Sequence, residues 1–119
     1  MDVSIEAELQ ALADGLDKGL FFDNLDPLIE TAKRIVDRAD GPVMLAAWIV
    51  ESVLADLQTF WDDYPVAPVA HGRVNEALGP ALKRVVRAMI APDQRVFLNG
   101  HQEALVGQLV QLQHDQAIR

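Results

Sequence analysis

Histidine is the side chain in this sequence best suited to hold a metal ion or move a proton, so the spacing of the three histidines is informative. His101 and His114 are 13 residues apart, which is about 20 Å along one helix and too far for a shared ion. The sequence also lacks a Glu-x-x-His pair, the ligand motif of four-helix di-iron proteins. We therefore predict no metal site and no cofactor.

Two adjacent carboxylates, Asp62 and Asp63, occupy the last turn of an expected helix, where the carbonyl end of the helix disfavours negative charge. Such a pair can bind a cation, accept a proton or bind an arginine of a partner, and with Tyr64 and His71 it forms a candidate polar site. His71 could serve as a base, although its position just before an expected helix is also typical of a solvated histidine. Alternatively, Arg73 neutralises the two carboxylates within the fold. The spacing fixes no second acid nearby, so it supports no general acid and base pair.

A basic strip runs along one side of the helix expected after residue 71 and consists of Arg73, Lys83, Arg84 and Arg87. It is a candidate anion-binding surface for a phosphate or an acidic segment of a partner. The alternative is the ordinary solvated face of an amphipathic helix. The strip lacks interleaved aromatic residues and a glycine-rich phosphate loop, so it gives little support to nucleotide or single-strand binding. No serine has a plausible histidine and acid partner, and no catalytic residue is predicted.

Composition excludes further classes of chemistry. The 119-residue chain contains no Cys, which rules out disulfides, thiolate metal sites and a cysteine nucleophile and agrees with a reducing, cytoplasmic setting. Its N-terminus lacks the basic and apolar regions of a signal peptide. The longest apolar run, residues 42–50, is far shorter than the roughly 18 residues of a membrane span. We expect a soluble protein with a single helical-bundle domain over residues 1–119.

Charge is distributed unevenly along the chain, whose formal net charge is −8. Residues 1–63 contain 14 of the 18 acidic and 4 of the 10 basic residues, a net of −10, which leaves +2 for the remainder. An acidic chain is poorly suited to general nucleic-acid binding, since that affinity comes largely from neutralised phosphates, and it favours a basic or neutral protein partner. The two halves could equally attract one another within a monomer or across a dimer.

Apolar residues recur at intervals of three and four along most of the chain, which predicts helices at 5–16, 26–39, 42–63, 74–89 and from 101 to near the C-terminus. We expect an all-α fold, a compact bundle of four long helices plus a short helical or irregular segment at 93–99, with the helix over about 42–63 in the centre. In the fourth helix the apolar residues keep their intervals of three and four on both sides of Pro80, which favours one kinked helix over two separate ones. Residues 64–69 are expected to form an extended strap.

Local signals predict where helices begin and which side chains pair. Ser4 or Asp2 should cap the first helix, and Asp26 followed by Pro27 should start the second. Two ion pairs at four-residue spacing are expected on the exposed face of the second helix, Glu30 with Arg34 and Lys33 with Asp37.

The helix over 42–63 has two apolar faces in its first half. The face that runs its full length, and should form the core, contains Val43, Ala46, Val50, Val53, Leu54, Leu57, Phe60 and Trp61. The opposite face carries Met44, Leu45 and Trp48. This second patch must be covered either by the apolar residues 20–22 with the first helix or by another chain.

These features favour a non-enzymatic protein–protein interaction module: a regulator, adaptor or inhibitor that forms a homodimer or binds a partner through Met44, Leu45 and Trp48. One alternative is a small-ligand-binding protein or enzyme with a pocket between residues 62–65 and the basic strip. Another is an acidic inhibitor that mimics nucleic-acid phosphates.

Overall fold

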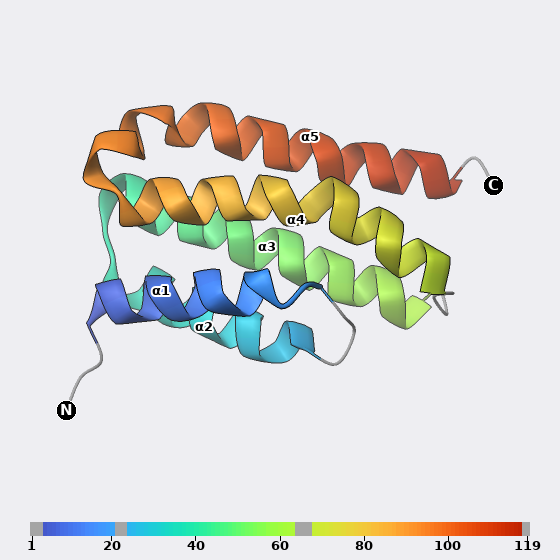
Figure 1. Cartoon of the computed structure of the whole chain (residues 1–119), viewed down its shortest axis with the longest axis horizontal. Helices are drawn as coiled ribbons and strands as arrows, with labels where there is room; N and C mark the ends of the chain where they lie inside the picture. The colour runs from blue at the N-terminus through green and yellow to red at the C-terminus, as the bar shows by residue number, and fades with distance from the viewer. Residues whose placement is uncertain (1–3, 21–23, 64–67, 118–119) are drawn as a thin grey trace.

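The chain folds into an all-α bundle, which confirms the predicted fold class (Figure 1). The structure, a computed structural model, describes residues 4–20, 24–63 and 68–117, without the side chains of residues 60–63, 68–71 and 115–117. Within these ranges there are five α-helices, one 3-10 helix and no strand. In chain order they are α1 (Ile5–Asp17), α2 (Leu25–Arg38), α3 (Gly41–Asp63), α4 (Pro68–Ile90), the 3-10 helix η2 (Pro92–Phe97) and α5 (Leu98–Ala117).

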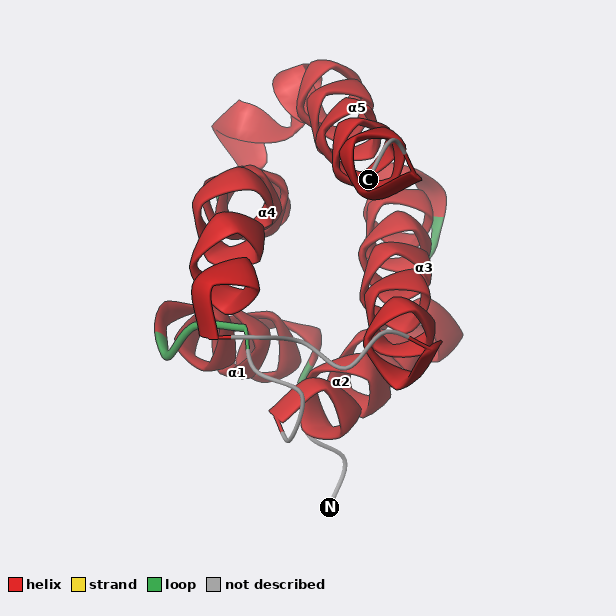
Figure 2. Ribbon diagram, turned by 90° about the vertical axis from the view of Figure 1, so that its right-hand side faces the viewer, coloured by secondary structure: helices red, strands yellow, loops and turns green. Residues whose placement is uncertain are grey.

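Consecutive α-helices run in opposite directions, so that α1, α3 and α5 point one way and α2 and α4 the other (Figure 1). The helix α3 packs mainly on α2, α5 packs mainly on α4, and α1 contacts both α2 and α4. Contacts of α3 with α4 and with α5 are less extensive. Seen along the bundle, α3 and α5 together border one side of the molecule (Figure 2).

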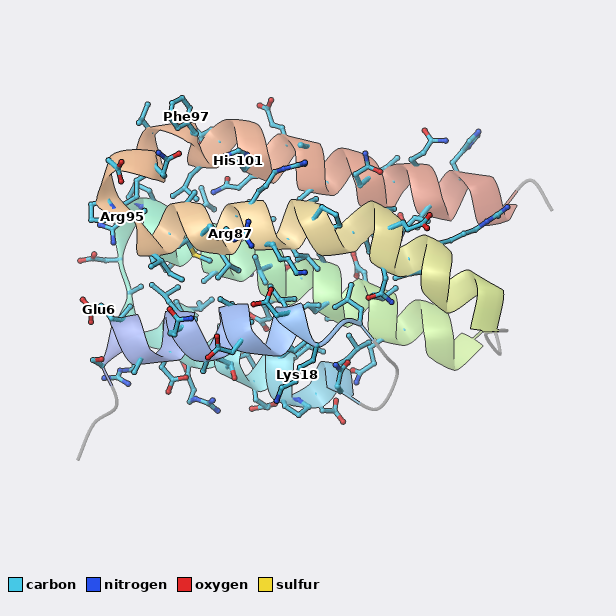
Figure 3. The ribbon with its side chains drawn as sticks, in the orientation of Figure 1. Glu6, Lys18, Arg87, Arg95, Phe97 and His101 are labelled. Carbon is cyan, nitrogen blue, oxygen red and sulfur yellow. The ribbon has the colours of Figure 1, made fainter. Side chains whose placement is uncertain are left out.

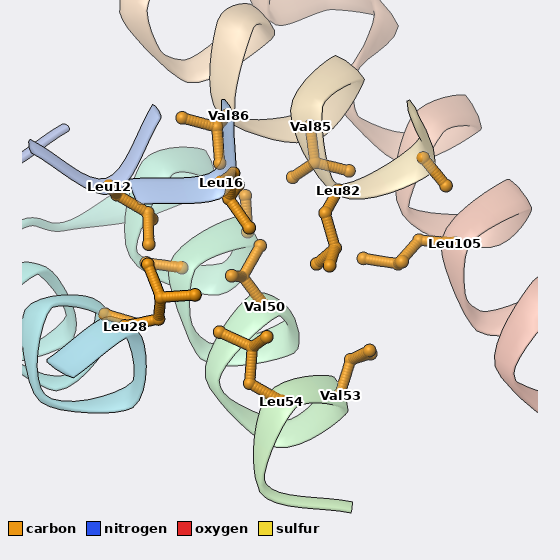
Figure 4. Close-up of a cluster of buried hydrophobic side chains, with 14 of the residues drawn as sticks. Leu12, Leu16, Leu28, Val50, Val53, Leu54, Leu82, Val85, Val86 and Leu105 are labelled. Atoms are coloured by element: carbon orange, nitrogen blue, oxygen red, sulfur yellow. The ribbon is translucent and has the colours of Figure 1, made fainter. Parts of the chain in front are cut away.

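One cluster of buried apolar side chains holds all five α-helices together (Figure 4). The side chains with the largest volume and almost no exposure are Leu9, Leu12, Leu16, Leu20, Leu25, Ile35, Leu54, Leu78, Leu82, Met89, Leu98 and Leu105. Removal of one such side chain from water contributes about 1.5–3 kcal/mol. The described part of the predicted core face of α3, from Val43 to Leu57, is buried as expected.

Two of the predicted helix starts have different outcomes. Ser4 caps α1 as expected, since its Oγ accepts a hydrogen bond from the Ala7 N–H at 3.2 Å. The predicted start of α2 is wrong, because the helix begins at Leu25 and Asp26 lies within its first turn. The carboxylate of Asp26 instead accepts a hydrogen bond from Gln58 Nε2 of α3 at 2.5 Å. A proline two residues after the first helical position is tolerated because N–H groups in the first turn have no partner within the helix.

The predicted ion pairs on α2 are also replaced by others. Arg34 reaches across to α1, where its Nε lies 3.1 and 3.2 Å from the two carboxylate oxygens of Glu8. Lys33 contacts Glu30 at 3.7 Å. The physical reason is burial, because Glu8 is buried between helices and a buried carboxylate gains more from an arginine than an exposed one does.

The connection between α2 and α3 is as short as predicted and depends on glycine. Gly41 has φ +59°, a conformation that residues with a side chain rarely adopt. Pro42 follows directly, at a position where its missing N–H has no partner to lose. The turn therefore places α2 and α3 side by side, in agreement with their extensive packing.

The course of α4 confirms one prediction and corrects another. The helix continues through Pro80 without a break, as its apolar register predicts. It begins at Pro68, however, so the expected extended strap is wrong at residues 68 and 69, and His71 lies inside the helix instead of before it. Residues 64–67 lie outside the described part of the chain.

Two sets of hydrogen bonds join α4 to the connection after α1 and to η2. The side-chain amide of Asn75 in α4 makes two hydrogen bonds to the backbone of Leu20. The Leu20 N–H donates to Asn75 Oδ1 at 2.6 Å, and Asn75 Nδ2 donates to the Leu20 carbonyl at 2.9 Å. Leu20 is thereby buried in the core, whereas residues 21 and 22 lie outside the described part of the chain. At the other end of α4, Arg95 donates two hydrogen bonds to the Met89 carbonyl at 3.2 and 3.1 Å, from the short helix η2 that the sequence predicts (Figure 3).

The segment Gly41–Thr59 of α3 is long and apolar enough to cross a membrane by length and composition alone. The core helix of a soluble protein meets the same criterion. Here one face of the segment, including Val50 and Leu54, is buried against other helices of the bundle. The fold is therefore compatible with a soluble protein.

Candidate interaction surface

Met44, Leu45 and Trp48 form an exposed apolar patch on the first half of α3, which we call the α3 patch. Their exposed fractions are 37%, 44% and 53%. They lie opposite Val50 and Leu54, which are fully buried. Neither α1 nor Leu20 covers the patch, because α1 packs on α2 and α4 and Leu20 is buried in the core. The sequence predicted that residues 20–22 and the first helix, or else another chain, cover this patch. The described part of the first alternative, Leu20 with α1, leaves the patch exposed.

The apolar surface continues from α3 onto α5 across an open groove between the two helices. The groove is lined by Ile49 from α3 and by Gln102, Glu103, Val106 and Gly107 from α5. Val106 is 43% exposed, and Val110, one turn further along α5, is 55% exposed. We call Leu45, Trp48, Ile49, Val106 and Val110 together the α3–α5 face.

Sequence reasoning missed the contribution of α5. In the sequence, Leu105, Leu109 and Leu112 recur at intervals of four and three, which indicates a core stripe, and Val106 and Val110 lie beside them. The structure buries Leu105 and Leu109 but leaves both valines exposed. A signal was present, since the valines are four residues apart and so form a second row beside the leucines.

Charge on this side of the molecule has a single sign. The sequences of α3 and α5 contain no Lys or Arg. Glu103 is exposed at the groove, and Asp56 is exposed two turns beyond Ile49 on the same side of α3. The basic residues all come from other segments, namely Lys18, Lys33, Arg34, Arg38, Arg73, Lys83, Arg84, Arg87, Arg95 and Arg119.

Gln102 introduces an unusual polar group into the groove. The residue is only 6% exposed, yet its side-chain amide makes no hydrogen bond to the residues that the structure describes. A buried amide without a partner costs about 1–3 kcal/mol. The groove therefore contains a polar group that a bound partner could satisfy.

The basic strip is partly used within the fold. Lys83 contacts Asp17 of α1 at 3.5 Å and so helps to join α1 to α4. Arg73, Arg84 and Arg87 are exposed. An anion-binding role for these three arginines stays a prediction.

The candidate polar site stays a prediction as well. The backbone of α3 ends at Asp63 and α4 begins at Pro68, so Asp62 and His71 lie in helices that adjoin the same connection. The side chains of Asp62, Asp63 and His71, and the whole of Tyr64, lie outside the described part of the chain. Among the side chains that are described, no group of three or more His, Asp or Glu residues is close enough to hold a metal ion.

Comparison with known proteins identifies no relatives. No family model matches the chain, and no curated protein or solved structure is significantly similar to it.

Proposed function

We propose that this protein is a non-enzymatic protein–protein interaction module, a regulator, adaptor or inhibitor, whose contact surface is centred on Trp48. One observation carries the proposal: three large apolar side chains within five residues of α3 face away from the core. Contiguous exposed apolar surface on a small protein commonly marks an interaction site, and tryptophan is enriched among the residues that dominate binding energy.

Packing beneath the patch supports the same role. The opposite face of α3 is fixed in the core by Val50, Leu54 and Leu57. A contact surface on a helix held in this way loses little backbone freedom on binding, which favours affinity. The α3 patch is therefore presented on a preorganised element.

Two measurements test the proposal: self-association of the purified protein, and capture of proteins that bind it. Each is made on the wild type and on two matched variants. Trp48→Glu places a charge in the α3 patch, and Val96→Glu places one at a site in η2 that is 77% exposed and distant in sequence from the patch. Circular dichroism should show both variants to be folded. We expect the wild type and Val96→Glu to retain the same partner or the same self-association by sedimentation, and Trp48→Glu to lose it. Wild-type protein that stays monomeric and binds no protein in a Trp48-dependent way would contradict the proposal.

A further inference from the structure

We propose that the α3–α5 face binds an amphipathic helix of a partner protein, with apolar residues facing the groove and Lys or Arg residues flanking them. This inference rests on the proposed function, because it specifies the partner of the same interaction module. It extends the contact surface from α3 to the groove beside α5.

The geometry fits a helix as the occupant. Helices α3 and α5 run in the same direction along one side of the bundle (Figures 1 and 2). Between them lies the open groove with Ile49 on one wall and Val106 on the other. Trp48 and Val110 extend the apolar surface beyond the groove. A helix laid into such a groove presents residues at intervals of three and four to both walls, which is the usual mode of helix recognition.

The charge pattern selects a basic partner over a second copy of this chain. Glu103 at the groove and Asp56, two turns beyond Ile49 on α3, are exposed, and α3 and α5 contain no Lys or Arg to balance them. In a symmetric dimer formed through this face, both contacting surfaces would be acidic, and neither copy would offer a Lys or Arg from α3 or α5 to pair with these side chains. Like charges placed together oppose association, whereas Lys and Arg residues on a partner helix would pair with them.

Gln102 supports a polar contact inside the groove. Gln102 is more than nine-tenths buried and lines the groove, and its side-chain amide has no hydrogen-bond partner among the described residues. An amide oxygen accepts hydrogen bonds from the ammonium group of Lys or the guanidinium group of Arg. A basic side chain that turns into the groove would therefore satisfy it.

Two synthetic peptides test this inference. Each is a helix of about 18 residues, long enough for five turns, with leucines along one face. One carries lysines beside the leucines, and the other carries glutamates at the same positions. Fluorescence anisotropy of labelled peptides should show the lysine peptide binding at least about tenfold more tightly than the glutamate peptide. Equal binding of the two peptides would overturn the inference.

Matched variants separate specific binding from general attraction between a basic peptide and an acidic protein. Glu103→Lys changes the charge at the groove, and Glu76→Lys makes the same change at an exposed site on α4. Gly107→Leu fills the groove, whereas Gly72→Leu adds the same side chain at an exposed site on α4, and neither glycine has a neighbouring atom within 4 Å of an added Cβ.

We expect Glu103→Lys and Gly107→Leu each to weaken binding of the lysine peptide by about tenfold or more. Glu76→Lys and Gly72→Leu should change it by less than about threefold. Equal effects of the two lysine variants would show attraction to net charge alone, and equal effects of the two leucine variants would show binding outside the groove. Either result would overturn the inference.

Failure of this inference is distinguishable from failure of the proposed function. If the lysine peptide does not bind but Trp48→Glu abolishes self-association or capture of another protein, the α3 patch is an interface and the basic-helix inference is wrong. If Trp48→Glu changes no association of any kind and the peptide does not bind, both are wrong.

Discussion

The outer face of α2 and the α3–α5 face are both exposed helical surfaces, yet their residues differ in kind. On α2 every exposed residue except Pro27 is charged: Asp26, Glu30, Lys33, Arg34, Asp37 and Arg38. On the α3–α5 face Leu45, Trp48, Val106 and Val110 are exposed, although polar residues at these positions would leave the core unchanged. Exposed positions on α2 thus carry residues suited to water, whereas these four positions on α3 and α5 carry apolar residues, which a contact surface would require.

Glycines show the same contrast between tightly packed and open regions. A Cβ added to Gly15 in α1 would lie 2.5 Å from Leu28 Cδ2 of α2, so the two helices approach closely there. A Cβ added to Gly100 or Gly107 in α5 would meet no atom within 4 Å. The α1–α2 pair is therefore closed by internal packing, while this side of α5 has room for another molecule.

The largest expected effect comes from the buried side of α3. Leu54→Ala should lower the free energy of unfolding by about 3 kcal/mol, because Leu54 is fully buried and its truncation leaves a cavity. Urea denaturation followed by circular dichroism measures this change. Leu45→Ala, on the exposed side of the same helix, is the matched control and should change it by less than about 0.5 kcal/mol. Similar losses for the two variants would remove the distinction between the faces.

The pair formed by Arg34 and Glu8 should show the next largest effect. Arg34→Ala leaves the buried Glu8 carboxylate without its partner, and we expect a loss of about 1–2 kcal/mol, reduced by solvent because Arg34 itself is half exposed. Lys33→Ala removes an exposed pair with Glu30 and should cost less than about 0.5 kcal/mol. Thermal denaturation compares the two variants. Equal melting temperatures would show that the contact between α1 and α2 does not depend on this pair.

Replacement of Gly15 and of Gly100 by alanine should change the free energy of unfolding in opposite directions. Gly15→Ala should be less stable than the wild type by about 1 kcal/mol, because Leu28 must move out of the way. Gly100→Ala should be more stable by about 0.5–1 kcal/mol, since alanine favours the helix and the space is open. A stabilising Gly15→Ala would mean that α1 and α2 pack less closely than described. Differential scanning calorimetry detects both changes.

Much of the fold can be predicted because its signals are local. The apolar register carries α4 through Pro80, Ser4 caps α1, and Gly41 with Pro42 makes the short turn. The errors involve contacts between helices. Arg34 pairs with Glu8 instead of Glu30 because a long side chain can reach a neighbouring helix, and sequence spacing does not show which neighbour is present.

The candidate surface was predictable only in part for the same reason. Helical angles alone separate Met44, Leu45 and Trp48 from the core face of α3. The role of Val106 and Val110 depends on which side of α5 faces α3, and this is set by tertiary packing. The burial of Gln102 in the groove likewise follows from the placement of two helices that are far apart in the sequence.

The smallest expected change comes from Trp48→Glu, which distinguishes a contact surface on α3 from a part of the core. The measurement is the free energy of unfolding of Trp48→Glu by urea denaturation at low protein concentration. We predict a value within about 0.5 kcal/mol of the wild type, because Trp48 is 53% exposed and Glu favours the helix. A loss of about 3 kcal/mol or more, typical of a buried aromatic residue, would instead show that Trp48 is part of the core.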